Sequence, residues 1–438
     1  MSIWGKAQRL AEKAPPERNR YVDFLRAFSI LAVVVGHWLV AAPYVDGDGE
    51  VVGGHLLGIL PWTQWLTWGF QVMPIFFLVG GFSNGVSWAA WKRDGKPYSA
   101  WFASRIQRLI NPVFPVLLVW AGLTFIGTQA GLDRSVVRMA AQLALIPVWF
   151  LAVYLFITAL TPLTHAAWKR YGWVSIGALV LAATIVDIAR VGFGVTHAGW
   201  ANFAFVWLAV HQLGYAWGDG ALNRGARPWA LFLAGLGSLV ALVALLPYPV
   251  AMIGVPGSDL SNSMPPTLAL LALAFTQSGL ALVLENAGRR MLDNLQVWTA
   301  VVLMNGMIMT VYLWHLTAFV AVLVAAWLFG GVGLDAYPGS ASWWLARPVW
   351  FALYIITLLP LIAIFARFEQ GSSMDEKALP NWQLVLGLVL ISLGLAMTAA
   401  ISIASPEGVS GVRLWVVALP FIGAALVGFG PVAKWLRG

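Results

Sequence analysis

The sequence predicts an all-α membrane protein that crosses the bilayer about twelve times. Of its 438 residues, 60% are hydrophobic and only 10% are charged, and the mean hydropathy is +0.80. Soluble domains carry about 25% charged residues, whereas apolar runs of roughly 20 residues are typical of transmembrane helices. No polar stretch is long enough to form a sizeable soluble domain. We therefore expect a multi-pass protein of the plasma membrane.

The chain begins with a basic segment, residues 1–20, in which apolar residues recur at helical spacing. This pattern predicts a short amphipathic helix that lies on the inner membrane surface. The apolar runs that follow place twelve spans near residues 24–44, 66–90, 109–127, 140–163, 173–189, 200–217, 229–247, 266–284, 299–329, 346–366, 382–404 and 414–433.

The basic residues predict the orientation of these spans. With the N-terminus inside, 21 of the 26 Lys and Arg residues fall in inside segments. Because cytoplasmic loops are enriched in Lys and Arg, both termini are expected in the cytoplasm, with residues 92–108 inside and 45–61 outside. The net charge of +8 therefore reflects topology and does not indicate nucleic-acid binding. The five remaining basic residues are expected outside: Arg134, Arg138, Arg190, Arg347 and Arg413.

Arg26 and His37 are separated by ten residues that carry no charge. At 3.6 residues per turn, eleven steps amount to about three turns and a rise of about 16 Å, so both side chains lie on one face of one helix. A histidine at membrane depth is costly unless it lines a cavity or has partners, which makes it a candidate functional residue. The alternative is a histidine that hydrogen-bonds between helices and serves only the structure.

The basic loop 92–108 ends in Arg105-Ile106-Gln107-Arg108, at the cytoplasmic mouth of the third span. Residues three apart share a helix face, and guanidinium groups suit the binding of phosphates. The pattern therefore indicates a phosphate site. The alternative is a topological role together with contacts to anionic lipids.

The ninth span carries Tyr312 and His315, and the sixth carries His211. His315 and His37 lie about sixteen and thirteen residues above the inner ends of their spans, a difference of about 5 Å. At matching depth the two imidazoles would share one cavity. The alternative for His315 is an interfacial position beside Trp314, in the aromatic belt.

Other patterns limit the chemistry. The glycine pair within Phe76-Phe77-Leu78-Val79-Gly80-Gly81-Phe82-Ser83-Asn84 is expected to permit close helix packing. The chain has no Cys, which excludes a thiolate nucleophile, disulfides and sulfur-ligated metals. Neither the zinc-protease nor the nucleotide-binding motifs are present, and acidic residues do not cluster within the spans, so no metal is expected.

Together these stretches resemble the integral-membrane acyltransferase-3 family, whose members move acyl groups, commonly acetyl from acetyl-CoA, onto sugars and other hydroxylated acceptors. The resemblance covers roughly residues 18–366. It rests on four stretches: Tyr21-Val22-Asp23-Phe24-Leu25-Arg26 leading to Gly36-His37, Phe76-Phe77-Leu78-Val79-Gly80-Gly81-Phe82, Arg105-Ile106-Gln107-Arg108 with a nearby proline, and Tyr312-Leu313-Trp314-His315.

The resemblance implies a ten-span acyltransferase core over residues 21–366, followed by 367–438 as a cytoplasmic loop and two additional spans. It implies transfer of an acyl group from cytoplasmic acyl-CoA to a hydroxyl of an envelope glycan or glycolipid, with His37 as general base. The CoA phosphates would be held by Arg105 and Arg108, with Arg26 nearby. The remaining candidates for orienting or acceptor-binding roles are Asp23, Tyr312, His315 and His211.

Three alternatives stay open at this point. A covalent acyl-histidine would use His37 as a nucleophile instead of a base. A twelve-span secondary transporter would fit the span count and the cytoplasmic termini, although no internal repeat is visible in the sequence. An acyl-group conduit would lack an acceptor site of its own and would hand the acyl group to a separate partner.

Overall fold

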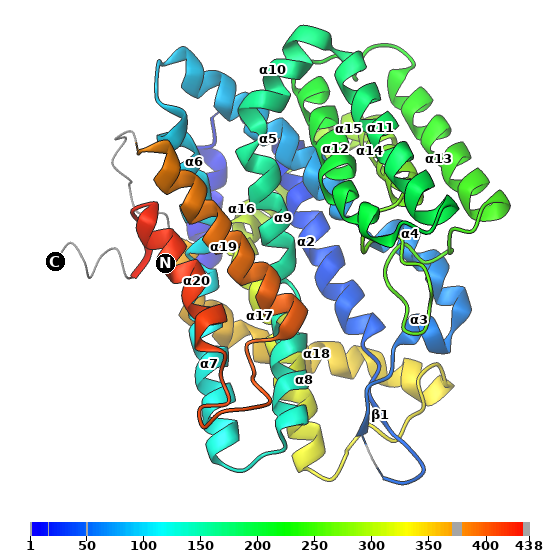
Figure 1. Cartoon of the computed structure of the whole chain (residues 1–438), viewed down its shortest axis with the longest axis vertical. Coiled ribbons are helices and arrows are strands. Elements are labelled where there is room, and N and C mark those ends of the chain that lie inside the picture. Colours follow the sequence, from blue (N-terminus) through cyan, green and yellow to red (C-terminus); the bar gives the residue numbers. More distant parts are fainter. Residues whose placement is uncertain (1, 16, 50, 370–378, 432–438) are drawn as a thin grey trace. The chain divides into compact units, whose positions relative to one another are not determined.

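Helices make up nearly all of the regular structure in this computed structural model, which describes residues 2–15, 17–49, 51–369 and 379–431 (Figure 1). The strands found in these ranges are one short pair, β1 (Tyr44–Val45) and β2 (Val51–Val52). The prediction of an all-α polytopic protein is therefore confirmed.

The chain forms two compact units, which are described here one at a time. The first unit comprises Met1–Tyr44, Val51–Ala89 and Leu160–Gly306, and the second comprises Val45–Glu50, Ala90–Ala159 and Met307–Gly438. The units interleave along the chain, so they divide it differently from the three expected segments 1–20, 21–366 and 367–438. Parts of the last expected segment, residues 370–378 and 432–438, lie outside the described residues.

The first unit contains most of the helices. They are α1 (Ile3–Glu12), α2 (Arg20–Val40), α3 (Leu56–Ile59), α4 (Thr67–Phe70), α5 (Met73–Arg93, whose last residues belong to the second unit), α10 (Thr161–Tyr171), α11 (Trp173–Asp187), α12 (Asn202–Gly218), α13 (Arg227–Leu245), α14 (Leu268–Val283), α15 (Glu285–Met291) and α16 (Leu295–Asn305). Short helices at Pro61–Leu66, Ile188–Gly192 and Thr196–Ala201 connect them.

The centre of the first unit is α12. Every residue from Val206 to Trp217 is buried, and α12 contacts α10, α11 and α14. By contrast, α13 buries only Gly235 and Leu239, so its other apolar side chains are partly or fully exposed. An apolar helix that is largely exposed is stable only in lipid, which agrees with a membrane location.

The backbone between α4 and α5 is not helical, and side chains satisfy its polar groups. Gln277 Nε2 donates hydrogen bonds to the carbonyls of Trp68 and Gln71, at 2.9 and 3.1 Å. The Gln71 side chain in turn donates a hydrogen bond from Nε2 to the carbonyl of Met252 at 3.3 Å. Irregular backbone at membrane depth requires such internal partners. The span expected at 66–90 is therefore an interrupted helix.

The N-terminal segment forms the expected amphipathic helix, α1. Its small residues Ala7 and Ala11 are buried against α16, and Trp298 Nε1 donates a hydrogen bond to the Ala11 carbonyl at 3.1 Å. Ile3 and Leu10 are exposed on the other side. The location of α1 on the inner membrane surface stays a prediction.

The second unit contains α6 (Tyr98–Ile110), α7 (Val113–Gln129), α8 (Arg134–Leu145), α9 (Val148–Ala159), α17 (Ile308–Leu328), α18 (Ala341–Phe365), the single turn Ala366–Glu369, α19 (Asn381–Ile401) and α20 (Leu414–Leu426). Its centre is α17, in which every residue from Thr310 to Val320 is buried. The α19 and α20 helices pack side by side, shown in orange and red in Figure 1.

Among the described residues, nine helices are long and apolar enough to cross a membrane, and the bent pair α14–α15 raises that number to ten. Two further expected spans, 200–217 and 414–433, correspond to shorter helices, α12 and α20. The total of twelve spans and the position of both termini stay predictions.

The span expected at 299–329 is not one helix. α16 ends at Asn305 in the first unit, and α17 begins at Ile308 in the second. Gly306 disfavours a continuous helix, and Met307 has a non-helical backbone with φ −134° and ψ 14°. Asn305 Nδ2 donates to the carbonyls of Val301 and Asp23, at 2.9 and 3.0 Å, which anchors the end of α16.

Candidate functional site

Arg26 and His37 lie on one unbroken helix, α2, as the spacing predicts. The helix begins after Asn19, whose side chain accepts hydrogen bonds from two backbone N–H groups of the first turn. Eleven residues of α-helix place the two side chains on the same side, about 16 Å apart along the axis. His37 lies in the last turn and is half-buried. Its imidazole is therefore nearer the end of α2 than the expected span 24–44 indicates.

Asp23 lies between two arginines and fixes both. Its Oδ2 atom accepts from Arg18 Nε at 2.6 Å, and its Oδ1 atom accepts from Arg26 Nη1 at 3.2 Å. The second Arg26 nitrogen, Nη2, donates to Ser83 Oγ of α5 at 3.0 Å. Because a guanidinium carries five N–H donors, Arg26 retains capacity for a further anionic ligand while held in one orientation.

His211, on α12, lies in a buried polar cluster of the first unit. Its Nε2 atom is 3.2 Å from Asn84 Nδ2, and its ring meets Tyr215 edge to face with ring centroids 5.1 Å apart. The Tyr215 hydroxyl in turn forms a hydrogen bond with Thr164 Oγ1 at 2.9 Å. His211 itself is fully buried.

Ser83 and Asn84 are adjacent on α5, so this helix contacts both Arg26 and His211. The contact depends on glycine, as the sequence predicts. A Cβ atom on Gly81 would lie 1.9 Å from the His211 carbonyl oxygen, and one on Gly214 would lie 2.3 Å from a backbone oxygen of α5. Ser83 and Asn84 are not among the predicted site residues, although two polar residues within an apolar span are a signal of function.

In the second unit, Arg105 and Arg108 lie in the last turns of α6, a separate helix. The chain breaks before α7 at Asn111-Pro112, where proline has no N–H group to continue the helix. The Arg105 guanidinium lies over the Trp101 ring, 5.6 Å from its centroid, and the exposed Arg108 is attracted electrostatically to Glu369. The stretch Tyr98–Gln129 is long and apolar enough to cross a membrane and includes both arginines, whereas the predicted third span begins after them, at residue 109.

A cavity of about 480 Å³ lies beside this motif, a size typical of small-molecule sites. Gln107 and Asn111, from the end of α6, line it together with Arg367. Apolar groups form the rest, including Phe114 and Leu118 of α7. Such a cavity offers hydrogen-bonding groups at one part of its wall and apolar surface at another. Neither Arg105 nor Arg108 lines it, although Gln107 lies between them in the sequence.

Tyr312 and His315 are buried on α17. The Tyr312 hydroxyl donates to the Pro147 carbonyl at 2.8 Å, and His315 Nδ1 lies 2.7 Å from the Tyr312 carbonyl. Trp314 is 1% exposed and stacks on Phe365 with ring centroids 4.0 Å apart. The side chains of His315 and Trp314 both lie within the protein, so neither is exposed to lipid, and the depth of His315 in the membrane stays a prediction.

The depth of His315 in its span is estimated from one continuous helix, and the break before α17 changes that estimate. His315 lies about two turns into a helix that begins at Ile308, so the estimate from one helix over 299–329 does not apply. His37 and Arg26 belong to the first unit, whereas Arg105, Arg108 and His315 belong to the second. Their assembly into one site stays a prediction.

Within the described residues, no group of three or more His, Asp or Glu side chains is placed to hold a metal ion. The chemistry available from the candidate residues is proton transfer by imidazole, anion binding by guanidinium, and hydrogen bonding by amides and hydroxyls.

The family model of an acyltransferase domain matches residues 19–400, which is most of the chain and extends past residue 366 into α19. Comparison with curated proteins and with solved structures gives no match.

Proposed function

Because the chain belongs to the acyltransferase-3 family of membrane proteins, we propose that it transfers an acyl group, in the simplest case acetyl, from cytoplasmic acyl-CoA to a hydroxyl of an envelope glycan or glycolipid. The plasma membrane is the proposed location. The observation that carries the proposal is the pair formed by Arg26 and His37 on one side of α2, with Arg26 held by Asp23 and Ser83.

The proposed donor site uses the guanidinium groups for the CoA phosphates. Arg105 and Arg108 at the end of α6 suit charge-assisted hydrogen bonds to phosphate, and Arg26 is the third candidate. Glu369 attracts the Arg108 guanidinium electrostatically and would compete with phosphate for it. The cavity beside Gln107, in the same unit as these two arginines, offers amide groups and apolar surface for a donor molecule.

In the proposed reaction, the acceptor oxygen attacks the thioester carbonyl while the His37 imidazole takes the hydroxyl proton. The carbon–sulfur bond then breaks, the acyl group remains on the acceptor oxygen, and the CoA thiolate leaves and takes up a proton. A rise of about 16 Å between Arg26 and His37 gives the pantetheine arm room to extend from phosphate to thioester. Asp23 positions Arg26, and His211, Tyr312 and His315 are proposed as orienting residues.

The competing mechanism forms an acyl-histidine at His37 before the acceptor reacts. Both mechanisms break the same thioester bond and release the same thiol. They differ in whether the acyl group is ever bonded to the protein.

The test is acyl transfer by the purified protein with radiolabelled acetyl-CoA and an extract of envelope glycolipids and glycans. We expect label in the extract and an equal amount of released CoA thiol. Because the chain has no Cys, a thiol reagent reports released CoA without background from the protein. A transporter would release no thiol, and a conduit would label the extract only after a partner protein is added. Either result would contradict the proposal.

The proposed reaction also requires the predicted orientation, which single-cysteine labelling tests. Asp94 and Gly53 are exposed, and a Cβ atom at Gly53 would meet no atom within 4 Å. In intact cells, we expect an impermeant maleimide to label Gly53→Cys and to leave Asp94→Cys unlabelled until the cells are opened, because basic loops stay inside. Labelling of Asp94→Cys in intact cells would reverse the topology and place the donor site on the wrong side.

A further inference from the structure

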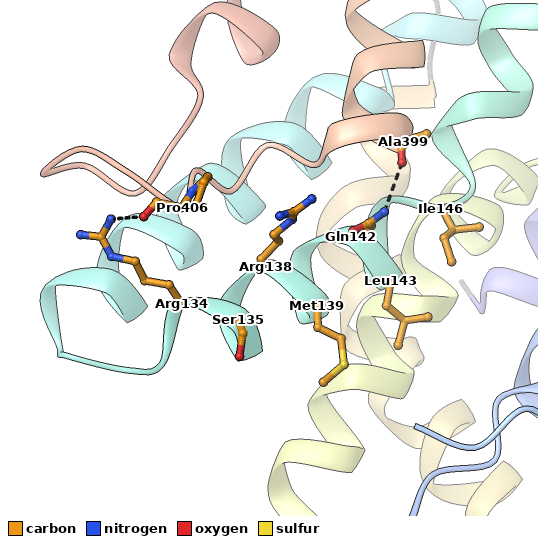
Figure 2. Close-up of a pocket in the computed structure, with 9 residues that line it drawn as sticks. All are labelled: Arg134, Ser135, Arg138, Met139, Gln142, Leu143, Ile146, Ala399 and Pro406. Atoms are coloured by element: carbon orange, nitrogen blue, oxygen red, sulfur yellow. Dashed lines mark hydrogen bonds between the residues drawn. The ribbon is translucent and has the colours of Figure 1, made fainter. Parts of the chain in front are cut away.

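A second cavity in the second unit, of about 600 Å³, has no part in the proposed reaction. It lies along one side of α8, and we call it the α8 cavity (Figure 2). Its wall on α8 includes Arg134, Arg138, Met139, Gln142 and Leu143, and Ile146 lines it directly after the end of the helix. Ala399 of α19 and Pro406, from the loop between α19 and α20, line the opposite wall.

The loop that closes the cavity is held by backbone contacts to two arginines. Arg134 donates to the carbonyls of Pro406 and Gly408, at 2.7 and 3.2 Å. Arg413 Nη1 donates to carbonyls at the end of α19, including that of Ser402 at 3.0 Å. Both guanidinium groups therefore bind backbone carbonyls and hold the loop in place.

Arg138 differs from these two arginines. No described residue forms a hydrogen bond or ion pair with its side chain, which is exposed and extends between Pro406 and Gln142 in Figure 2. The nearby acidic residues, Asp133 and Glu407, do not line the cavity. The Asp133 carboxylate is engaged at the start of α8, where it caps the helix. Hydrogen bonds from the side chain and backbone of Ser135 lower its pKa there. The α8 cavity therefore carries an uncompensated positive charge.

The rest of the α8 cavity is apolar and accessible. Met139 is 57% exposed and Ile146 is 36% exposed, although both have large hydrophobic side chains. Ile146 lies eight residues beyond Arg138, which corresponds to about 12 Å along the helix. A cation at one end and apolar surface at the other match an amphiphile with an anionic headgroup, because each part of such a molecule finds its complement.

We propose that the α8 cavity binds an anionic phospholipid. The headgroup phosphate accepts hydrogen bonds from Arg138 and from the Gln142 amide, whose 3.5 Å contact with the Ala399 carbonyl is weak. The acyl chain lies along Met139, Leu143 and Ile146. A free phosphate would have the same headgroup contacts but would leave this apolar surface exposed. On the predicted topology, the lipid belongs to the outer leaflet. This site does not depend on the proposed acyl transfer.

The test is native mass spectrometry of the delipidated full-length protein, titrated with phosphatidylglycerol and, separately, with phosphatidylcholine. We expect tighter binding of phosphatidylglycerol, and about tenfold weaker binding of it by Arg138→Gln, because a charge-assisted contact is lost. Arg224→Gln is the matched control, since it removes the same charge from an exposed position outside the cavity. Met139→Glu should also weaken phosphatidylglycerol binding, because it places a negative charge beside the chain.

Each contrary outcome overturns the proposal. Equal loss of binding in Arg138→Gln and Arg224→Gln would mean that only the overall charge attracts the lipid. Equal affinity for the two lipids would remove the requirement for an anionic headgroup. Competition by glycerol 1-phosphate at the same concentration as phosphatidylglycerol would show a free-phosphate site without a role for the chain. The thermal unfolding profile of each variant verifies that it is folded.

Discussion

Replacement of His37 by glutamine is expected to abolish acyl transfer while leaving acyl-CoA binding largely intact. An amide keeps hydrogen-bonding capacity but does not accept a proton at neutral pH, and general base catalysis contributes about 10²–10⁴-fold to a rate. Binding should persist because none of the proposed phosphate contacts is His37: Arg26 lies about 16 Å away along α2, and Arg105 and Arg108 lie on another helix, α6. The measurement is acyl transfer and acyl-CoA binding on the same purified variant.

Two matched variants separate catalysis from structure. His211→Gln and His315→Gln make the same chemical change at buried histidines that are proposed only to orient other groups. We expect a smaller loss of transfer in both. If His37→Gln retained wild-type turnover, the imidazole would serve only as a hydrogen-bonding group between helices, and the catalytic assignment would fail.

A further experiment on the wild-type protein distinguishes His37 as a general base from His37 as a nucleophile. Acetyl-CoA is mixed with wild type without acceptor, the reaction is quenched, and the peptides are examined for an added acetyl group. An acyl-histidine mechanism requires that group on the peptide with His37, whereas a general base requires none. Since the chain has no Cys, a thioester to the protein does not complicate the result.

Features that depend on local spacing are predictable from the sequence. The shared face of Arg26 and His37 follows from the period of an α-helix, and α2 is continuous through both residues. The close approach at Gly81 follows from the absence of a side chain, and the structure brings the His211 backbone against it. In both cases one helix or one residue type determines the outcome.

Features that depend on several helices are not predictable in this way. Hydropathy alone joins residues 299–329 into one span, because a single Gly306 does not interrupt an apolar run. The break arises from the backbone at Met307 and from the hydrogen bond of Asn305 to the Asp23 carbonyl, a residue distant in the sequence. The same reasoning applies to Arg138, whose difference from Arg134 depends on which of them the 402–413 loop contacts.

A large loss of acyl-CoA affinity is expected when the proposed donor site is changed. Arg105→Ala and Arg108→Ala should each weaken acyl-CoA binding, because each removes charge-assisted contacts worth roughly 1.5–3 kcal/mol, or about 10- to 150-fold in Kd. Acetyl-pantetheine, which lacks the phosphorylated nucleotide, should bind wild type weakly and should bind both variants with unchanged affinity. The measurement is the Kd of each ligand by isothermal titration.

Controls for this experiment come from the contacts of the two arginines. Arg108→Lys keeps the charge but loses the paired donors, so its affinity should be intermediate. Glu369→Gln removes the carboxylate that attracts Arg108. If Arg108 binds phosphate, this change should not weaken acyl-CoA binding, because it removes a competing anion. Wild-type affinity for acyl-CoA in both alanine variants would mean that Arg105 and Arg108 serve topology, and the donor site would have to lie elsewhere.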